Sequence, residues 1–352
     1  MESLHKIVLI IPSLDQGGME RVMSNIANSF VNRGIETHLI LLINRNIAYT
    51  VDDRVLIHFP EFEYNSSLRN KFKVLSYLIK KLREIRPTSA LSFGEIFNSL
   101  SIVAGKLTGI NIYISDRSSP IKSKGLINDA LRKLLYPLAN GLIAQTNFAK
   151  EVFKRRKYNS NIIAIPNPLK ELASKNAHQE RNIITVGRLV KSKNHEFIIK
   201  TYYELKAFDW HLYIVGHGPE YASLKSLCES LRISKNVTFV GSSNNVDEWL
   251  QKGTVFVYAS ESEGFPNALS EAVAFPVATI AFDCVAGPNE IIQNDYNGIL
   301  VPLGDRERFK NELRVLLASE SKRQFFEQNA IKNRRLFSLE VISEQYLNFI
   351  LT

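Results

Sequence analysis

The chain contains little cysteine and no long apolar run. Its two cysteines, Cys228 and Cys284, form no CxxC pair, so we expect neither a disulfide framework nor a thiolate metal site. The longest apolar run, residues 272–282, is well below the ~20 residues of a membrane span. The first run, "IVLII", is too short for the core of a signal sequence. This composition favours a globular protein in a reducing cytoplasm.

Histidines with the spacing of metal ligands are also missing. No HExxH or similar pattern occurs, and a structural or surface position is the simpler explanation for each histidine. We therefore predict no protein-held metal and no cofactor. The histidines are His5, His38, His58, His178, His195, His211 and His217.

The 352 residues exceed the usual size of one core and predict two domains. Net charge is +9, which indicates an anionic partner: nucleic acid, an acidic lipid surface or a phosphorylated ligand. Residues 69–86 carry many basic residues against one acid, Glu84, and residues 122–137 repeat this basic amphipathic pattern. We expect both segments to be helices with their apolar stripes in the core.

Strand and helix patterns alternate along nearly the whole chain, which predicts parallel sheets with crossover helices. The alternation breaks in the proline-rich and polar stretch around residues 165–182 and then starts again. We therefore expect an α/β protein with two doubly wound halves. The predicted parts are a domain over 1–166, a linker over 167–181, a second domain over 182–335 and a terminal helix over 336–352.

Two loops after predicted strands suit a phosphate-bearing ligand. Gly17 and Gly18 in "GGMER" let a ligand approach the backbone at the start of a helix. Arg188 and Lys193 in "GRLVKSKN" suit a diphosphate, because they combine a planar fork with a mobile point charge. For Gly17 and Gly18 the alternative is a tight strand-to-helix turn without a ligand. For Arg188 and Lys193 it is an ordinary solvated loop.

The segment "SESEGFPNALSEA" has Glu263 before a turn and Glu271 in the helical pattern that follows. Pro266 suits the first helical position, so both carboxylates are expected at the carboxyl end of a strand, where open α/β sheets bind ligands. Two solvated surface acids are the alternative. The nearby "VGHGP" fails as a dinucleotide fingerprint, since Tyr221 occupies the third glycine position.

In this order, "GGMER", "GRLVKSKN", "VGHGP" and "EGFPNALSEA" resemble the retaining GT-B glycosyltransferases of family 4, of the glycosyl transferases group 1 type. The resemblance implies two Rossmann-like doubly wound parallel-sheet domains facing across a cleft, with the last helix crossing back to the first domain. The second domain would hold most of a nucleotide-sugar. The implied contacts are Arg188 and Lys193 on the donor diphosphate, Glu271 on the ribose, Glu263 on the donor sugar, Asn267 on the sugar and phosphate, Ser243 on the base, and Gly17 and Gly18 on the donor from the first domain.

One loop departs from the family. Many relatives have a histidine where this chain reads "YISDRSSP". Arg117 in that loop is permanently cationic and only donates hydrogen bonds, so it is no general base. We expect it to bind the sugar or an acceptor phosphate.

The resemblance implies a metal-free hexosyltransferase that uses a nucleotide-sugar, with UDP as the expected nucleotide and a hexose or N-acetylhexosamine as the sugar. The expected acceptor is a lipid-diphosphate-linked sugar or another glycan in surface polysaccharide assembly. We expect peripheral attachment to the anionic inner face of the cell membrane and no nucleic-acid partner. A nucleotide-sugar epimerase and a basic nucleic-acid-binding protein are the alternatives.

Overall fold

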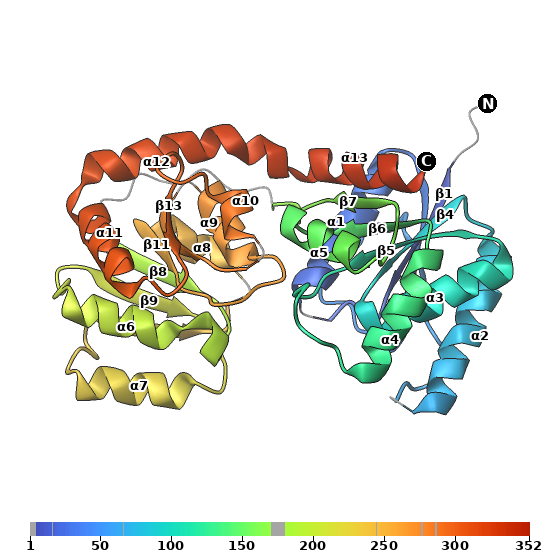
Figure 1. Cartoon of the computed structure of the whole chain (residues 1–352), viewed down its shortest axis with the longest axis horizontal. Coiled ribbons are helices and arrows are strands. Elements are labelled where there is room, and N and C mark those ends of the chain that lie inside the picture. Colours follow the sequence, from blue (N-terminus) through green and yellow to red (C-terminus); the bar gives the residue numbers. More distant parts are fainter. Residues whose placement is uncertain are drawn as a thin grey trace. The chain divides into compact units, whose positions relative to one another are not determined.

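The structure is a computed structural model that describes residues 5–352 apart from 16, 66, 170–179, 244, 276, 286 and the side chain of residue 333. Most of the predicted linker therefore lies outside the described residues. The chain divides into two compact units, Met1–Pro168 with Phe337–Thr352, and Leu169–Leu336 (Figure 1). The first unit thus combines the first half of the sequence with its last helix.

The described part of the first unit forms a parallel sheet of seven strands in the order β3-β2-β1-β4-β5-β6-β7. Helices cover both faces, so its central strands are continuous apolar runs, as in "IVLII" of β1. The strands are β1 Lys6–Ile11, β2 Glu36–Leu41, β3 Leu56–His58, β4 Ser89–Phe93, β5 Asn111–Asp116, β6 Gly141–Ala144 and β7 Ile162–Ala164.

Two helices, the first and the last, cover one face of this sheet. Their shared core contains Phe30 of α1 and Tyr346 of α13, and the hydroxyls of Ser29 and Ser343 lie 2.7 Å apart. The return of the last helix to the first unit is thereby confirmed. The helices of this unit are α1 Gly18–Asn32, α2 Leu68–Ile85, α3 Glu95–Thr108, α4 Leu126–Leu135, the 3₁₀ turn η1 Tyr136–Leu138, α5 Asn147–Arg155 and α13 Leu339–Ile350.

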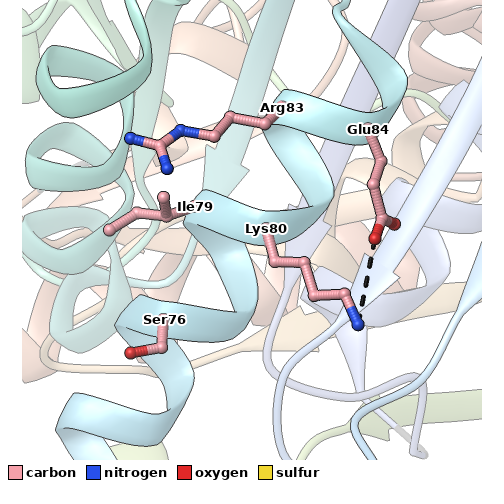
Figure 2. Close-up of a pocket in the computed structure, with 5 residues that line it drawn as sticks. All are labelled: Ser76, Ile79, Lys80, Arg83 and Glu84. Atoms are coloured by element: carbon pink, nitrogen blue, oxygen red, sulfur yellow. Dashed lines mark ion pairs between the residues drawn. The ribbon is translucent and has the colours of Figure 1, made fainter.

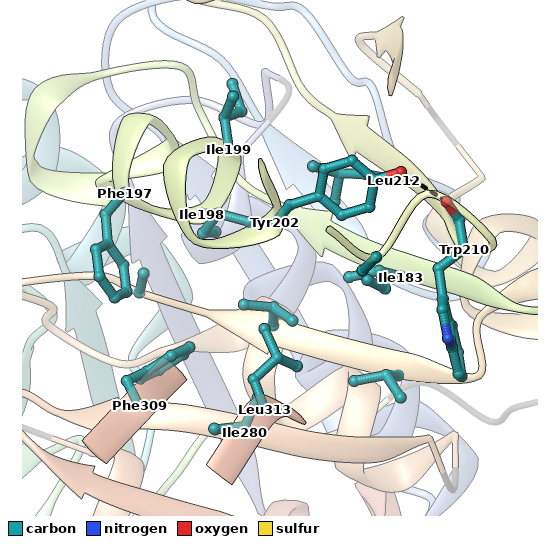
Figure 3. Close-up of a cluster of buried hydrophobic side chains, with 14 of the residues drawn as sticks. Ile183, Phe197, Ile198, Ile199, Tyr202, Trp210, Leu212, Ile280, Phe309 and Leu313 are labelled. Carbon is teal, nitrogen blue, oxygen red and sulfur yellow. Dashed lines mark hydrogen bonds between the residues drawn. The ribbon is translucent and has the colours of Figure 1, made fainter. Parts of the chain in front are cut away.

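Within its described residues, the second unit has a parallel six-stranded sheet in the order β10-β9-β8-β11-β12-β13. Figure 3 shows part of the core on one face, where Phe197, Tyr202 and Trp210 surround strand residues and the Tyr202 hydroxyl donates to the Trp210 carbonyl at 2.7 Å. The strands are β8 Asn182–Val186, β9 His211–Val215, β10 Val237–Gly241, β11 Val255–Tyr258, β12 Ala278–Asp283 and β13 Ile299–Pro302. The helices are η2 Lys191–Lys193, α6 His195–Glu204, α7 Tyr221–Ser230, α8 Val246–Lys252, α9 Asn267–Ala274, α10 Pro288–Ile291, α11 Arg306–Ala318, α12 Glu320–Asn333 and η3 Arg334–Phe337.

Both sheets reverse their strand order at one point, between β1 and β4 in the first unit and between β8 and β11 in the second. Open α/β sheets bind ligands outside the carboxyl ends of the strands that flank such a point. The two-sheet α/β fold expected from the sequence is confirmed. Its topology makes the loops after β1, β4, β8 and β11 the expected ligand-binding loops.

Two local predictions were wrong. Pro266 precedes α9 as its N-cap instead of starting the helix. The apolar stripe of residues 122–137 was expected in the core, but Leu126, Ile127 and Leu134 are exposed. The reason is that Tyr136 of η1 fills the core next to the sheet, while α4 packs against α3.

Candidate functional site

The loop after β8 is fixed by backbone contacts with the loop after β9. The N–H of Gly187 donates to the Val215 carbonyl at 3.0 Å, and that of Leu189 to the His217 carbonyl at 3.0 Å. A Cβ at position 216 or 218 would collide with the carbonyls of Gly187 and Leu189. The glycines of "VGHGP" therefore serve close packing of the loop that carries Arg188.

Lys193 at the end of this loop forms an ion pair with Glu263 from the loop after β11. The side chains are 18% and 10% exposed, so solvent reaches the pair. The Tyr258 hydroxyl, at the carboxyl end of β11, also contacts the Glu263 carboxylate and lies 3.4 Å from Lys193 Nζ. A backbone bond from Glu261 to the Ser192 carbonyl at 2.9 Å joins the two loops. The loops after β8 and β11, the two strands that flank the switch point, thus contribute opposite charges to one cluster of Lys193, Glu263 and Tyr258.

The protonation of the neighbouring groups follows from their burial. Burial, and then the charge of Glu263, raise the pKa of Tyr258 well above its ordinary value. The same two causes raise the pKa of the Cys284 thiol to about 12. Both groups stay neutral at physiological pH. The Tyr258 hydroxyl therefore donates a hydrogen bond to the Glu263 carboxylate, and the Cys284 thiol adds no second negative charge.

Helix α9 follows the Glu263 loop directly. Asn267 is its first residue and half-buried, and Glu271 lies one turn further on with 6% of its surface exposed. The N–H groups of a first helical turn have no partner inside the helix and attract anions. Asn267 and the start of α9 therefore extend the polar edge formed by the loops after β8 and β11.

Arg188 and Ser243 occupy different surroundings. Arg188 is exposed, on the same rigid loop as Lys193. Ser243 follows β10, and its hydroxyl accepts from the Asn245 N–H at 3.2 Å, which shapes the turn into α8. The neighbouring residue 244 lies outside the described residues.

In the first unit, Gly17 is the extended N-cap of α1, and Gly18 is the first helical residue. The Tyr49 hydroxyl lies 2.9 Å from both the N–H and the carbonyl of Gly17. A Cβ at Gly17 would meet only the Glu20 carboxylate, the mobile end of a side chain that can move aside, and burial raises the pKa of that carboxyl. Close packing therefore does not require glycine at position 17, and the start of α1 remains open to a ligand.

Arg117 follows β5 and is held on several sides. Its guanidinium lies 4.3 Å from the centre of the Phe93 ring, donates to the Tyr346 hydroxyl at 3.1 Å and contacts Asn167. Directly before it, Asp116 is fully buried in an ion pair with Arg132 of α4, at 2.5 Å. Arg117 is thus an oriented cation at the carboxyl edge of the first sheet.

Most of these groups were predicted from the sequence, but Tyr258 was not. Its signal was its position as the last residue of a buried aromatic strand, five residues before Glu263. Arg188, Lys193, Glu263, Asn267 and Glu271 share the carboxyl edge of the second sheet, and Gly17, Gly18 and Arg117 that of the first. No group of three or more His, Cys, Asp or Glu able to hold a metal occurs among the described residues.

Sequence comparison matches each half to a known family. Residues 170–333 match glycosyl transferases group 1, and residues 16–170 match glycosyltransferase family 4. The N-acetylgalactosamine-N,N'-diacetylbacillosaminyl-diphospho-undecaprenol 4-alpha-N-acetylgalactosaminyltransferase of Campylobacter jejuni is 28% identical over 99% of this chain and 100% of its own length. The amylovoran biosynthesis glycosyltransferase AmsD of Erwinia amylovora is 27% identical over 97% and 99%.

Solved structures match over nearly the whole chain. The lipopolysaccharide outer core galactosyltransferase WaaB has a TM-score of 0.78 at 20% identity and covers 98% of this chain and 99% of its own. Anabaena HepE, solved with UDP and glucose, has a TM-score of 0.82 at 13% identity and covers 98% of each chain. At these identities the likeness establishes the fold.

Proposed function

Because the chain belongs to the GT-B glycosyltransferases of the group 1 type, we propose that it transfers a sugar with retention from a UDP-sugar to a lipid-diphosphate-linked sugar. The donor sugar is a hexose or N-acetylhexosamine. The single observation that carries this proposal is the Lys193–Glu263–Tyr258 cluster beside Arg188, at the switch point of the second sheet.

Departure of a nucleoside diphosphate concentrates negative charge on its terminal phosphate. Arg188 and Lys193 would stabilise that charge, which is the main electrostatic task of such a site. The bond from the sugar C1 to the phosphate oxygen breaks, C1 bonds to the acceptor oxygen on the same face, and the acceptor proton goes to the leaving phosphate. As Lys193 turns to the diphosphate, Glu263 becomes available to the sugar hydroxyls and to positive charge at C1.

The remaining residues would bind and orient the donor. Glu271 would accept from the ribose hydroxyls, Asn267 would contact the sugar and phosphate, and Ser243 would lie near the base. In the first unit, Gly18 offers the start of α1 to the donor, and Arg117 is an oriented cation for a sugar or an acceptor phosphate.

Related proteins support the choice of donor and acceptor. HepE and the pneumococcal transferase GtfA were solved with UDP, and the name of the Campylobacter relative specifies a diphospho-undecaprenol acceptor. The names of these relatives favour transfer over epimerisation or nucleic-acid binding. Our proposal places the enzyme on the cytoplasmic membrane face, in surface polysaccharide or glycan assembly. None of the helices formed by the described residues has the length and hydropathy needed to cross a bilayer.

A thermal-shift screen with UDP-, GDP- and ADP-sugars tests the donor. A ligand at 100 times its dissociation constant adds about 2.7 kcal/mol to the free energy of unfolding. We expect UDP-sugars to give the largest shift, and product analysis to show transfer only when an acceptor is present. Conversion of the donor without an acceptor would favour the epimerase alternative.

Variants then test the site. We expect Arg188→Ala and Glu271→Ala to lower the rate at subsaturating donor by roughly two orders of magnitude and to leave the fold intact. Near-normal rates in both would refute the site assignment. Since two cations already face the diphosphate, EDTA should leave activity unchanged, and a loss that magnesium reverses would contradict the metal-free mechanism.

A further inference from the structure

One face of α4 is apolar and uncovered. Leu126 and Ile127 are 92% and 74% exposed, which makes them the two most exposed large apolar side chains among the described residues. Leu134 is exposed too, and the spacing 126, 127, 130, 134 puts these residues and Ala130 on the same side of the helix. Scattered surface leucines are ordinary, but a continuous apolar helix face indicates a binding surface.

The opposite side of α4 is anchored firmly. Arg132 is 1% exposed, pairs with Asp116 at 2.5 Å, and lies 5.0 Å from the Tyr158 ring. Its neighbour Tyr136 is fully buried in the core. Because Arg132 is turned inward, α4 is held in an orientation that keeps its apolar face outward.

Basic side chains surround this face. Lys122 and Lys133 are exposed on and beside α4. A groove of about 720 Å³ next to Ala130 is lined by Lys133 and by Arg155, Arg156 and Lys157 from the end of α5. Asp129 also lines the groove, but its carboxylate already accepts from Ser123 and Arg132. An apolar strip bordered by cations matches a bilayer with acidic headgroups.

Over most of its length, helix α2 is less suited than α4 to bind a bilayer. Figure 2 shows a pocket on it where Ile79 lies between charged side chains, and Lys80 faces Glu84 at 3.9 Å. Lys81 also pairs with Glu84, at 2.8 Å. Its central apolar residues Leu78 and Leu82 are buried. This part of α2 can attract anionic lipid but has no exposed apolar side chain to insert.

The apolar face lies close to the loops of the site. Lys124, just before α4, pairs at 2.9 Å with Glu95 at the start of α3, directly after β4. Exposed Leu68 and Phe72 near the start of α2 belong to the same edge, because a crossover helix begins where its preceding strand ends. The carboxyl edge of the first sheet therefore has an apolar and basic border.

We propose that the α4 face inserts into the headgroup region of an anionic bilayer and holds the carboxyl edge of the first sheet against the membrane. The proposal rests on the proposed function only for the consequence that a lipid-linked acceptor reaches this edge directly. A second copy of the chain is a worse occupant, because a two-fold contact through this face would oppose the same lysines and arginines.

Flotation of the full chain with vesicles tests the surface. The wild type should bind phosphatidylcholine vesicles that contain half phosphatidylglycerol, and bind pure phosphatidylcholine far less. Leu126→Glu together with Ile127→Glu should weaken binding about tenfold or more, since it removes both the apolar contact and part of the attraction. Leu107→Glu is the matched control: this exposed leucine lies at the C-terminal end of α3, on the opposite edge of the same sheet.

An environment-sensitive fluorophore separates insertion from simple attraction. Both native cysteines are buried, so Ile127→Cys can be labelled selectively after a check that the unsubstituted chain takes up no label. The label should shift to the blue on anionic vesicles, whereas a label on Leu107→Cys should not. The proposal would be overturned if the Leu126→Glu/Ile127→Glu double variant bound anionic vesicles as well as the wild type does. An unchanged emission spectrum of the label at position 127 would also overturn it. A dimer that the double Glu variant dissociates, without vesicle binding, would identify a second copy as the occupant.

The function has a separate readout. Stabilisation of the chain by UDP reports the donor site in the second unit and should be the same in the Glu variants. If UDP does not stabilise the chain but vesicle binding behaves as predicted, the donor assignment is refuted and the membrane surface stands. If UDP stabilises the chain normally but the Leu126→Glu/Ile127→Glu double variant binds vesicles like the wild type, the donor assignment stands and the membrane surface is refuted.

Discussion

Each unit holds an ion pair near the carboxyl edge of its sheet, and the two pairs differ in their access to solvent. In the first unit, Arg132 and Asp116 are 1% and 0% exposed. In the second, Lys193 and Glu263 are 18% and 10% exposed, at the switch point. A sealed pair keeps its partners, because an unpaired charge in the interior is costly. An accessible pair can exchange one partner for a ligand.

The neighbours of the two pairs reinforce this difference. Arg132 lies near the rings of Tyr136 and Tyr158. Burial opposes its charge most strongly, but Asp116, Tyr136 and Tyr158 together raise the pKa of Arg132. Glu263 instead shares its carboxylate between a flexible lysine and the Tyr258 hydroxyl. The first pair therefore serves folding, and the second is suited to binding.

The largest expected effect is on stability. Arg132→Met should lower the free energy of unfolding by about 3–5 kcal/mol, because it leaves Asp116 buried without its cation. Urea unfolding followed by far-UV circular dichroism measures this. Tryptophan fluorescence reports only the second unit, where Trp210 and Trp249 lie, and should change less. Arg156→Met is the control, since this exposed arginine lies 5.9 Å from the same Tyr158 ring. A loss below 1 kcal/mol would show that the pair is dispensable.

The second effect is on catalysis. Lys193→Ala should reduce kcat/KM about a hundredfold through lost stabilisation of the leaving diphosphate, with little change in stability. Lys191→Ala, an exposed lysine on the same 3₁₀ turn, should keep nearly the full rate. If Lys193→Ala unfolded the second unit instead, its pair with Glu263 would be structural, like that of Arg132.

The third effect depends on pH. Burial lowers the pKa of His195 at the start of α6 to about 4, from an ordinary 6.5. Between these values the unfolded chain binds the proton and the folded chain does not, so stability falls as pH falls through this window. From pH 7.5 to pH 5.0 the expected loss is about 2 kcal/mol.

Tryptophan fluorescence during urea unfolding at the two pH values follows this change in the second unit. His195→Gln should flatten the pH dependence, whereas His217→Gln, which removes an exposed histidine, should leave it as in the wild type. An equal loss in all three proteins would assign the acid sensitivity to other groups.

The smallest effect concerns Tyr258. Tyr258→Phe removes one donor to Glu263, and a hydrogen bond to a charged group contributes about 1.5–3 kcal/mol. We expect kcat/KM to fall about tenfold or somewhat more, while Tyr203→Phe on the exposed side of α6 changes little. Steady-state kinetics at varied donor concentration checks this. An unchanged value would mean that Lys193 alone orients Glu263.

The positions of Lys193 and Glu263 could be anticipated from the sequence, and the burial of Arg132 could not. Lys193 and Glu263 belong to loops that follow buried strands, and strand ends are readable from local apolar runs. Arg132 lies in "ALRKLL", where a basic residue in an amphipathic helix normally faces water. Its burial depends on Asp116 and Tyr158, which come from other elements. Tyr258 was missed for a similar reason, since its pattern is that of any buried strand.

The sequence by itself determined the alternating strands and helices, the two α/β units and the polar loops after their strands, because these features depend on neighbouring residues. Tertiary structure alone decided which strands flank each switch point and that α4 turns its leucines outward. Those outcomes depend on contacts between residues far apart in the chain. For α4, the decisive contact is the filling of the core by Tyr136, which leaves the apolar face without a protein partner in the described part of the chain.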